Sequence, residues 1–117
     1  MRSLVVKLTA GADAPERCLQ GLTVASVALA AGAEVSLWLT GESVLLATPG
    51  GELEIPESPP ASTLVTAVAA GGTVRVCTQC AARRGLTQDD LLPGITIAGA
   101  ATFVEQALAD GVQALVY

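Results

Sequence analysis

The chain has 117 residues, of which 51% are hydrophobic and only 15% are charged. This length predicts one domain over residues 1–117 that can bury a core without disulfide bonds or metal ions, and the composition excludes a disordered chain. A net charge of −5 and only 3% aromatic residues exclude the usual nucleic-acid binder, which needs a basic surface and stacking rings. The high apolar content indicates a buried interface between subunits.

The sequence contains no histidine. A Ser-His-Asp triad, a Cys-His dyad and a histidine-ligated metal site are therefore excluded for this chain alone. The groups that remain available for a reaction are carboxylates, arginines, backbone amides and the cysteines Cys18, Cys77 and Cys80. An odd number of cysteines, two of them closely spaced, is typical of a thiol protein in a reducing compartment.

Targeting and membrane signals are not recognisable in the sequence. Only three apolar residues lie between Ser3 and Lys7, too few for the core of a signal peptide. The longest nearly apolar stretch, residues 22–33, stops at Glu34, whereas a membrane span needs about 20 residues. We therefore expect a cytoplasmic protein that binds neither membranes nor nucleic acid.

Short apolar runs alternate with helical patterns along the whole chain. The runs are rich in β-branched residues and bounded by glycine or proline, which predicts buried parallel strands. In chain order the predicted elements are a strand at 3–9, a helix at 13–32, a strand at 35–40, a short apolar segment at 44–47, a loop at 49–60, a helix at 61–70, a strand at 73–77, a short helix at 77–85, one or two helical turns at 87–92, a strand at 95–99, a helix at 102–111 and a strand at 112–117. This alternation predicts an α/β fold with a mainly parallel sheet covered on both faces.

Capping signals mark two of the predicted helix starts. Asp13 is expected at the N-cap of the first long helix, with Glu16 three residues later. Thr102 and Glu105 form a capping box that is expected to open the last helix. The four prolines of residues 49–60 favour a loop.

Cys77 lies where a predicted parallel strand passes into its helix, at the sheet edge where α/β folds bind ligands. Free backbone N–H groups and the positive end of the helix favour its thiolate there. Cys80 follows three residues later on nearly the same helical face, so that the two thiols can approach each other. Cys77 and Cys80 are the candidate catalytic residues, and the alternative is that both are small buried hydrophobes. Cys18 lies on the apolar stripe of the first helix and is expected in the core.

Other features near the two cysteines leave alternatives open. A zinc site at the Cys-x-x-Cys pair would need further ligands from a second subunit, and we predict no metal. Arg83 and Arg84 either complement the C-terminus of the short helix or dock an acidic partner or another subunit. The loop at 49–60 is either a solvated connection or a lid over the cysteine site. The turn at Gly11 lacks the repeated glycines of a nucleotide-binding loop, and no cofactor is predicted.

One part of the chain has a recognisable pattern, TVRVCTQCAARRGLT at residues 73–87, followed by DDLLPG at 89–94 and IAGA at 97–100. It combines a strand, a cysteine, a short helix that ends in Arg-Gly-Leu-Thr, an acidic pair, Pro-Gly and a strand that ends in Gly-Ala. This pattern resembles the DsrE-like family, which includes the sulfur-relay subunits of the DsrE, DsrF, DsrH and Tus type. Looser agreement extends over almost the whole chain.

The resemblance implies a three-layer α/β/α sandwich with a five-stranded parallel sheet that assembles as dimers, trimers or hexamers. It implies that Cys77 carries sulfur as a persulfide and that Cys80 matches a second cysteine of some subfamilies. We therefore expect a homo-oligomeric sulfur carrier, similar to sulfurtransferases, that exchanges sulfane sulfur with donor and acceptor proteins. Two alternatives stay open: a thiol-disulfide or peroxide-reducing protein with Cys77 as nucleophile and Cys80 as resolving thiol, and a non-catalytic oligomeric binding module.

Overall fold

The computed structural model describes residues 2–117 and contains a five-stranded sheet in which all paired strands are parallel. The strands are β1 (Ser3–Leu8), β2 (Glu34–Leu39), β3 (Thr73–Cys77), β4 (Ile95–Ala98) and β5 (Val112–Val116), in the spatial order β4-β3-β2-β1-β5. The helices are α1 (Pro15–Ala30), α2 (Ala61–Gly71), α3 (Thr78–Arg83) and α4 (Ala100–Ala107), and the 3₁₀ helices are η1 (Gly41–Ala47) and η2 (Gln88–Asp90). The predicted α/β fold with a five-stranded sheet is confirmed.

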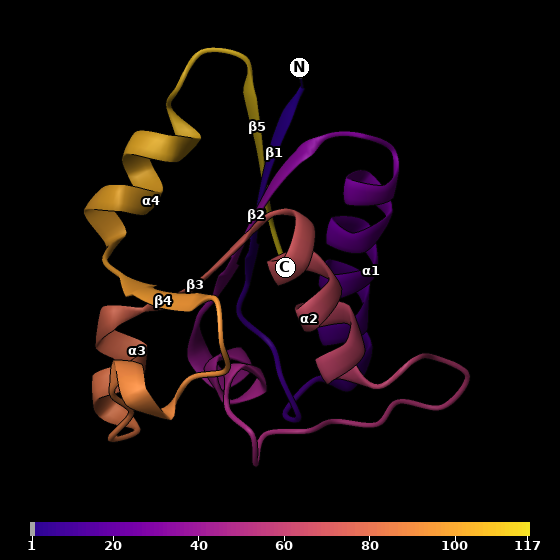
Figure 1. Ribbon diagram of the computed structural model, residues 1–117, viewed down its shortest axis with the longest axis vertical. Coiled ribbons are helices and arrows are strands. Elements are labelled where there is room, and N and C mark those ends of the chain that lie inside the picture. Colours follow the sequence, from indigo (N-terminus) through magenta and orange to yellow (C-terminus); the bar gives the residue numbers. More distant parts are fainter. Residues whose placement is uncertain (1) are drawn as a thin grey trace.

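The sheet lies between helices on its two faces (Figure 1). Because β1, β2, β3 and β4 follow one another in one direction across the sheet, right-handed crossovers put α1 and α2 on the same face. The chain then returns across the sheet from β4 to β5, and this reversed crossover puts α4 on the opposite face. The result is the three-layer α/β/α sandwich that the family resemblance implies.

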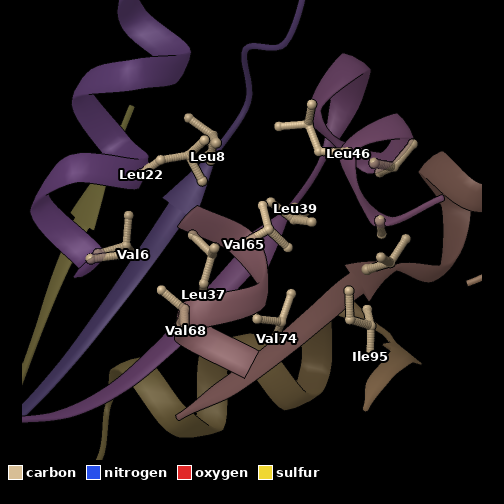
Figure 2. Close-up of a cluster of buried hydrophobic side chains, with 14 of the residues drawn as sticks. Val6, Leu8, Leu22, Leu37, Leu39, Leu46, Val65, Val68, Val74 and Ile95 are labelled. Carbon is tan, nitrogen blue, oxygen red and sulfur yellow. The ribbon is translucent and has the colours of Figure 1, made fainter. Parts of the chain in front are cut away.

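The main core lies between the sheet and the layer of α1 and α2. Alternate side chains of β1, β2 and β3 point into it and meet apolar side chains of the two helices, since successive residues of a strand face opposite sides. Figure 2 shows this cluster, which includes Val6, Leu8, Leu22, Leu37, Leu39, Val65, Val68 and Val74. Burial of one such side chain stabilises the fold by about 1.5–3 kcal/mol, so that this layer anchors the sheet.

The opposite face of the sheet is covered by α4 alone. Trp38 of β2 is buried there, and its ring packs edge-on against Phe103 of α4 with the ring centres 5.5 Å apart. The Trp38 Nε1–H donates to Oε1 of Gln106 at 2.8 Å. On β5, Leu115 and Val116 face opposite sides of the sheet and are 41% and 65% exposed, so that neither helix layer covers this edge strand. The expectation that helices cover both faces of the sheet is confirmed, and the edge strand β5 is left exposed.

Two predicted helix starts are wrong. The Asp13 carboxylate does not cap α1, because it accepts the Gly11 N–H at 2.8 Å and closes the preceding turn. The last helix, α4, begins two residues before Thr102 and has Gly99 at its N-cap. The Gly99 carbonyl accepts the Thr102 N–H at 3.1 Å, so that the helix starts directly where β4 ends. Backbone geometry at the strand end decides this boundary instead of the expected capping box.

Residues 49–60 form a loop, as predicted, and pack against the α1–α2 layer. Ile55 is buried and borders a cleft with Pro56 and Leu19 of α1. Glu52 accepts hydrogen bonds from the amide and the hydroxyl of Ser62 in α2, and these bonds lower the pKa of the Glu52 carboxyl. These contacts hold the loop on the face of the sheet that α4 does not cover.

Candidate functional site

Cys77 lies at the carboxyl end of β3 and is the N-cap residue of α3, the junction expected from the sequence. Its neighbour across the sheet is Ala98, the last residue of β4, which leads into α4. Through Ala81, α3 packs against the core of the α1–α2 layer, whereas α4 covers the opposite face. The chain segments that leave the adjacent strands β3 and β4 therefore diverge. Open α/β sheets bind ligands in the crevice at such a point.

The surroundings of the Cys77 sulfur favour its thiolate. Partial burial raises the pKa of the Cys77 thiol, but the Cys80 amide and thiol, the Gln79 amide and the charge of Lys7 together lower this pKa by more. The pKa therefore lies below that of an ordinary cysteine. The two amides belong to the second and third residues of α3, which an N-cap side chain normally meets. They form no full cap hydrogen bond with the sulfur, so that their influence is electrostatic.

The three cysteines are free thiols in three different environments. Cys80 is half-buried in α3 and packs against the edge of the core. Cys18 is fully buried in α1, and burial together with the charge of Asp13 raises the pKa of its thiol to about 11. Cys18 is therefore a core residue, as expected, and the structure brings Cys77 and Cys80 together.

A small cavity lies beside Cys77 on the α4 side of the sheet. It has a volume of about 40 Å³ and is lined by Lys7, Trp38, Thr40, Cys77, Ala100 and Phe103. The loop at residues 49–60 contributes no residue to this cavity and packs elsewhere, so that the lid hypothesis is wrong. The cavity opens instead between the carboxyl ends of three strands and the first turn of α4.

Lys7 is the cavity residue that sequence reasoning missed. Its Nζ lies 5.0 Å from the centre of the Phe103 ring, in a cation–π contact. Two signals in the sequence point to it. Lys7 lies between Val6 and Leu8, which both face the core, so that Lys7 faces the other side of the sheet. It is also close to the carboxyl end of a predicted parallel strand, the same edge as Cys77.

Arg84 has a structural role at the end of α3. Its Nη2 and Nε donate to Oε2 of Glu42 at 2.8 and 3.1 Å, and its Nη1 donates to the Cys80 carbonyl at 3.1 Å. These bonds tie α3 to η1 and hold the helix that Cys77 caps. Arg83 is exposed to solvent. Of the two roles left open for the arginines, Arg84 therefore fills the structural one.

Residues 2–117 contain neither a cluster of metal ligands nor a helix that could span a membrane. No group of three or more cysteine, aspartate or glutamate side chains in this range is placed to hold a metal ion. None of the helices in the same range combines the length and the apolar character that a membrane crossing requires.

Solved structures of similar fold cover essentially the whole chain. The YchN protein of E. coli has a TM-score of 0.85 at 18% identity, over 100% of both chains. The protein of unknown function MTH1491 from Methanobacterium thermoautotrophicum has a TM-score of 0.76 at 15% identity, again over 100% of both chains. The conserved protein of unknown function BT1422 from Bacteroides thetaiotaomicron has a TM-score of 0.65 at 18% identity, over 98% of this chain and 94% of its own.

Identities this low establish a shared fold and leave activity open. No curated protein matches the chain. The sequence profile of the DsrE/DsrF-like family matches residues 2–116, nearly the full length. This match agrees with the pattern around Cys77 and with the observed order of strands and helices. The chain therefore belongs to the DsrE/DsrF-like family.

Proposed function

We propose that this protein is a sulfur carrier, which accepts sulfane sulfur as a persulfide on Cys77 and passes it to another molecule. The observation that carries the proposal is the half-buried Cys77 sulfur at the start of α3, where two backbone amides and Lys7 favour the thiolate. Membership of the DsrE/DsrF-like family supports the same chemistry, because the sequence pattern around Cys77 resembles its sulfur-relay members.

The transfer needs a thiolate, access and a good leaving group. The Cys77 thiolate attacks the outer sulfur of a donor persulfide, R–S–SH. A new S–S bond forms at Cys77, the S–S bond of the donor breaks, and R–S⁻ leaves with the electron pair. In the second step an acceptor thiolate attacks the outer sulfur, and the Cys77 thiolate leaves. Groups that favour the Cys77 thiolate serve both steps, because they stabilise it as nucleophile and as leaving group.

Mass spectrometry of the intact protein after exposure to inorganic polysulfide tests this proposal. The wild-type protein is expected to gain one sulfur atom that a reductant removes, and the Cys77→Ser variant is expected to gain none. Cys80→Ser is the matched control, because it removes the other half-buried thiol of the same helix. Equal loading of the wild-type protein and Cys77→Ser would show that Cys77 is not the carrier.

A thiol-disulfide or peroxide-reducing function is the second candidate, favoured by the Cys80 thiol that faces the Cys77 sulfur. In that reaction Cys77 attacks a peroxide and becomes a sulfenic acid, and Cys80 then forms a disulfide with it as water leaves. Cys80→Ser separates the two functions, since persulfide transfer survives this change and peroxide turnover with a thiol reductant collapses. Indifference of both reactions to Cys77→Ser would favour a non-catalytic binding module.

We also propose that the protein is a homo-oligomer. Apolar side chains are exposed at the end of α4 and on β5, where the C-cap residue Leu108 is 78% and Val116 is 65% exposed. Exposed apolar patches on small proteins mark interaction sites, and the composition favours a second copy of the chain as the partner. Light scattering at micromolar concentration is expected to give a multiple of 11.7 kDa, and a mass of 11.7 kDa itself would refute the proposal.

A further inference from the structure

We propose that Lys7 and the cavity beside Cys77 form a subsite for a small anionic group. The sulfur compound that reacts with Cys77 would then carry a carboxylate, a sulfonate or a comparable anion next to its reacting sulfur. This inference rests on the proposed function for the nature of the reaction. The preference for an anion is a property of Lys7 and the cavity, and it can be measured without any sulfur transfer.

A stack of side chains on the α4 face holds Lys7 in place. The Lys7 Nζ lies 5.0 Å from the centre of the Phe103 ring, which packs edge-on against Trp38. Trp38 is only 1% exposed, and its Nε1–H donates to Oε1 of Gln106. The same oxygen accepts the Ser36 hydroxyl at 3.1 Å. These contacts keep the ammonium beside Cys77, whereas an ordinary surface lysine extends its head into water.

The charge at this cavity is opposite to that of the whole protein. The chain has a net charge of −5, yet the cavity is lined by one lysine and no acidic residue. The salt bridge found within residues 2–117 joins Arg84 to Glu42, so that no carboxylate in this range pairs with Lys7. Arg75 adds a second cation on the same face, 5.6 Å from the Trp38 ring centre. The Lys7 ammonium also stabilises the Cys77 thiolate, and since that negative charge is used up in the new bond, the ammonium can attract an anionic group of the reagent, more strongly where burial reduces screening.

The size of the cavity limits its occupant to a small group. Its volume of about 40 Å³ exceeds the ~10–15 Å³ that a cavity needs to hold one water molecule, so that it has room for a few non-hydrogen atoms. A carboxylate or sulfonate head fits this space, and a folded segment of protein does not. The cavity therefore fits the anionic head of a small-molecule donor or acceptor.

The subsite has a defined part in the proposed transfer. With the anionic head of a donor beside Lys7, the Cys77 thiolate attacks the neighbouring sulfane sulfur. An S–S bond forms at Cys77, the bond from the sulfane sulfur to the rest of the donor breaks, and the leaving group keeps the electron pair. The negative charge that develops on the leaving group then lies next to the Lys7 ammonium.

Two alkylating probes of nearly equal size, iodoacetate and iodoacetamide, test the subsite on the native protein. Both form a carbon–sulfur bond with the Cys77 thiolate as iodide leaves, and only iodoacetate carries a charge. Peptide mass spectrometry gives the rate constant of each probe at Cys77. The ratio of the two rate constants cancels the fraction of thiolate, so that it reports the preference for an anion alone.

Lys7→Met is expected to lower the iodoacetate-to-iodoacetamide ratio about three- to tenfold, the factor that one charge supplies in a partly screened site. Lys7→Arg keeps the charge and is expected to keep most of the ratio. Arg17→Met is the matched control, because it removes one positive charge from the exposed surface of α1 and is expected to leave the ratio unchanged.

Ionic strength provides a test that needs no variant. Salt screens the attraction, so that the ratio in the wild-type protein is expected to fall as salt is added. A ratio that Lys7→Met does not change, or that does not respond to salt in the wild-type protein, would overturn the subsite. Loss of polysulfide loading at Cys77 would instead refute the proposed function, and the two failures are thereby distinguished.

Discussion

Timed alkylation of the native protein with iodoacetamide near neutral pH is expected to label the cysteines in the order Cys77, Cys80, Cys18. The rate of alkylation follows the fraction of thiolate and the access to the sulfur. Cys77 combines partial exposure with a lowered pKa. Cys80 is half-buried and packs against the edge of the core, which limits access to its sulfur. Cys18 has no exposed surface.

The raised pKa of Cys18 sets a lower limit to the ratio of the alkylation rates of Cys77 and Cys18. A rise from 9.0 to about 11 lowers the fraction of thiolate at neutral pH about 100-fold relative to an ordinary thiol. Because Cys18 is also fully buried, its labelling requires a local opening of α1 from the sheet, which slows it further. The lowered pKa of Cys77 acts in the opposite direction, so that the ratio of the rates for Cys77 and Cys18 should exceed this factor.

Peptide mass spectrometry of samples quenched over time gives the three rate constants. The pH profile of Cys77 labelling should have its midpoint below that of free cysteine, because the pKa of its thiol is lowered. Cys77→Ser serves as a control and should leave the slow rate of Cys18 unchanged. Faster labelling of Cys80 or Cys18 than of Cys77 would refute the reasoning that assigns Cys77 as the nucleophile.

Three further predictions concern stability. The raised pKa of Cys18 means that the unfolded chain releases this thiol proton first, so the free energy of unfolding should fall by about 2 kcal/mol from pH 9 to pH 11, a slope that Cys18→Ala removes. Gln106→Met should lower the free energy of unfolding by about 1–3 kcal/mol because the buried Trp38 Nε1–H loses its acceptor. Urea unfolding followed by the fluorescence of the single tryptophan measures this loss, and an unchanged free energy of unfolding would contradict the prediction. Glu42→Gln should cost no more than about 1 kcal/mol because its ion pair with Arg84 is partly exposed. A double-mutant cycle with Arg84→Met measures that interaction, and a much larger coupling energy would show that the pair is better shielded than its exposure indicates.

The strands could be predicted from the sequence because their signal is local. A buried parallel strand is a short apolar run between glycines or prolines, and residues 73–77, for example, form β3 as predicted. The position of β5 beside β1 could not be predicted, because an alternation of strands and helices is compatible with several parallel strand orders. The start of α4 at Ala100 was missed for a related reason, since the end of β4 sets that boundary and Thr102 does not.

Cys77 and Lys7 differ in how far the sequence reveals them. Cys77 is recognisable because a strand that runs directly into a helix is a local pattern, and the N-cap position alone gives its sulfur two amide neighbours. Lys7 reaches the same cavity only through the sheet, where β2 separates β1 from β3 and the parallel register aligns Lys7 with Trp38 and Trp38 with Arg75. The amides of α3 make the thiol reactive toward any electrophile. Lys7 makes the smallest of the contributions that lower the pKa of this thiol, and its charge acts in addition on the charge of the reagent. Substitution of Lys7 should accordingly change which reagents Cys77 prefers more than how fast it reacts with neutral ones.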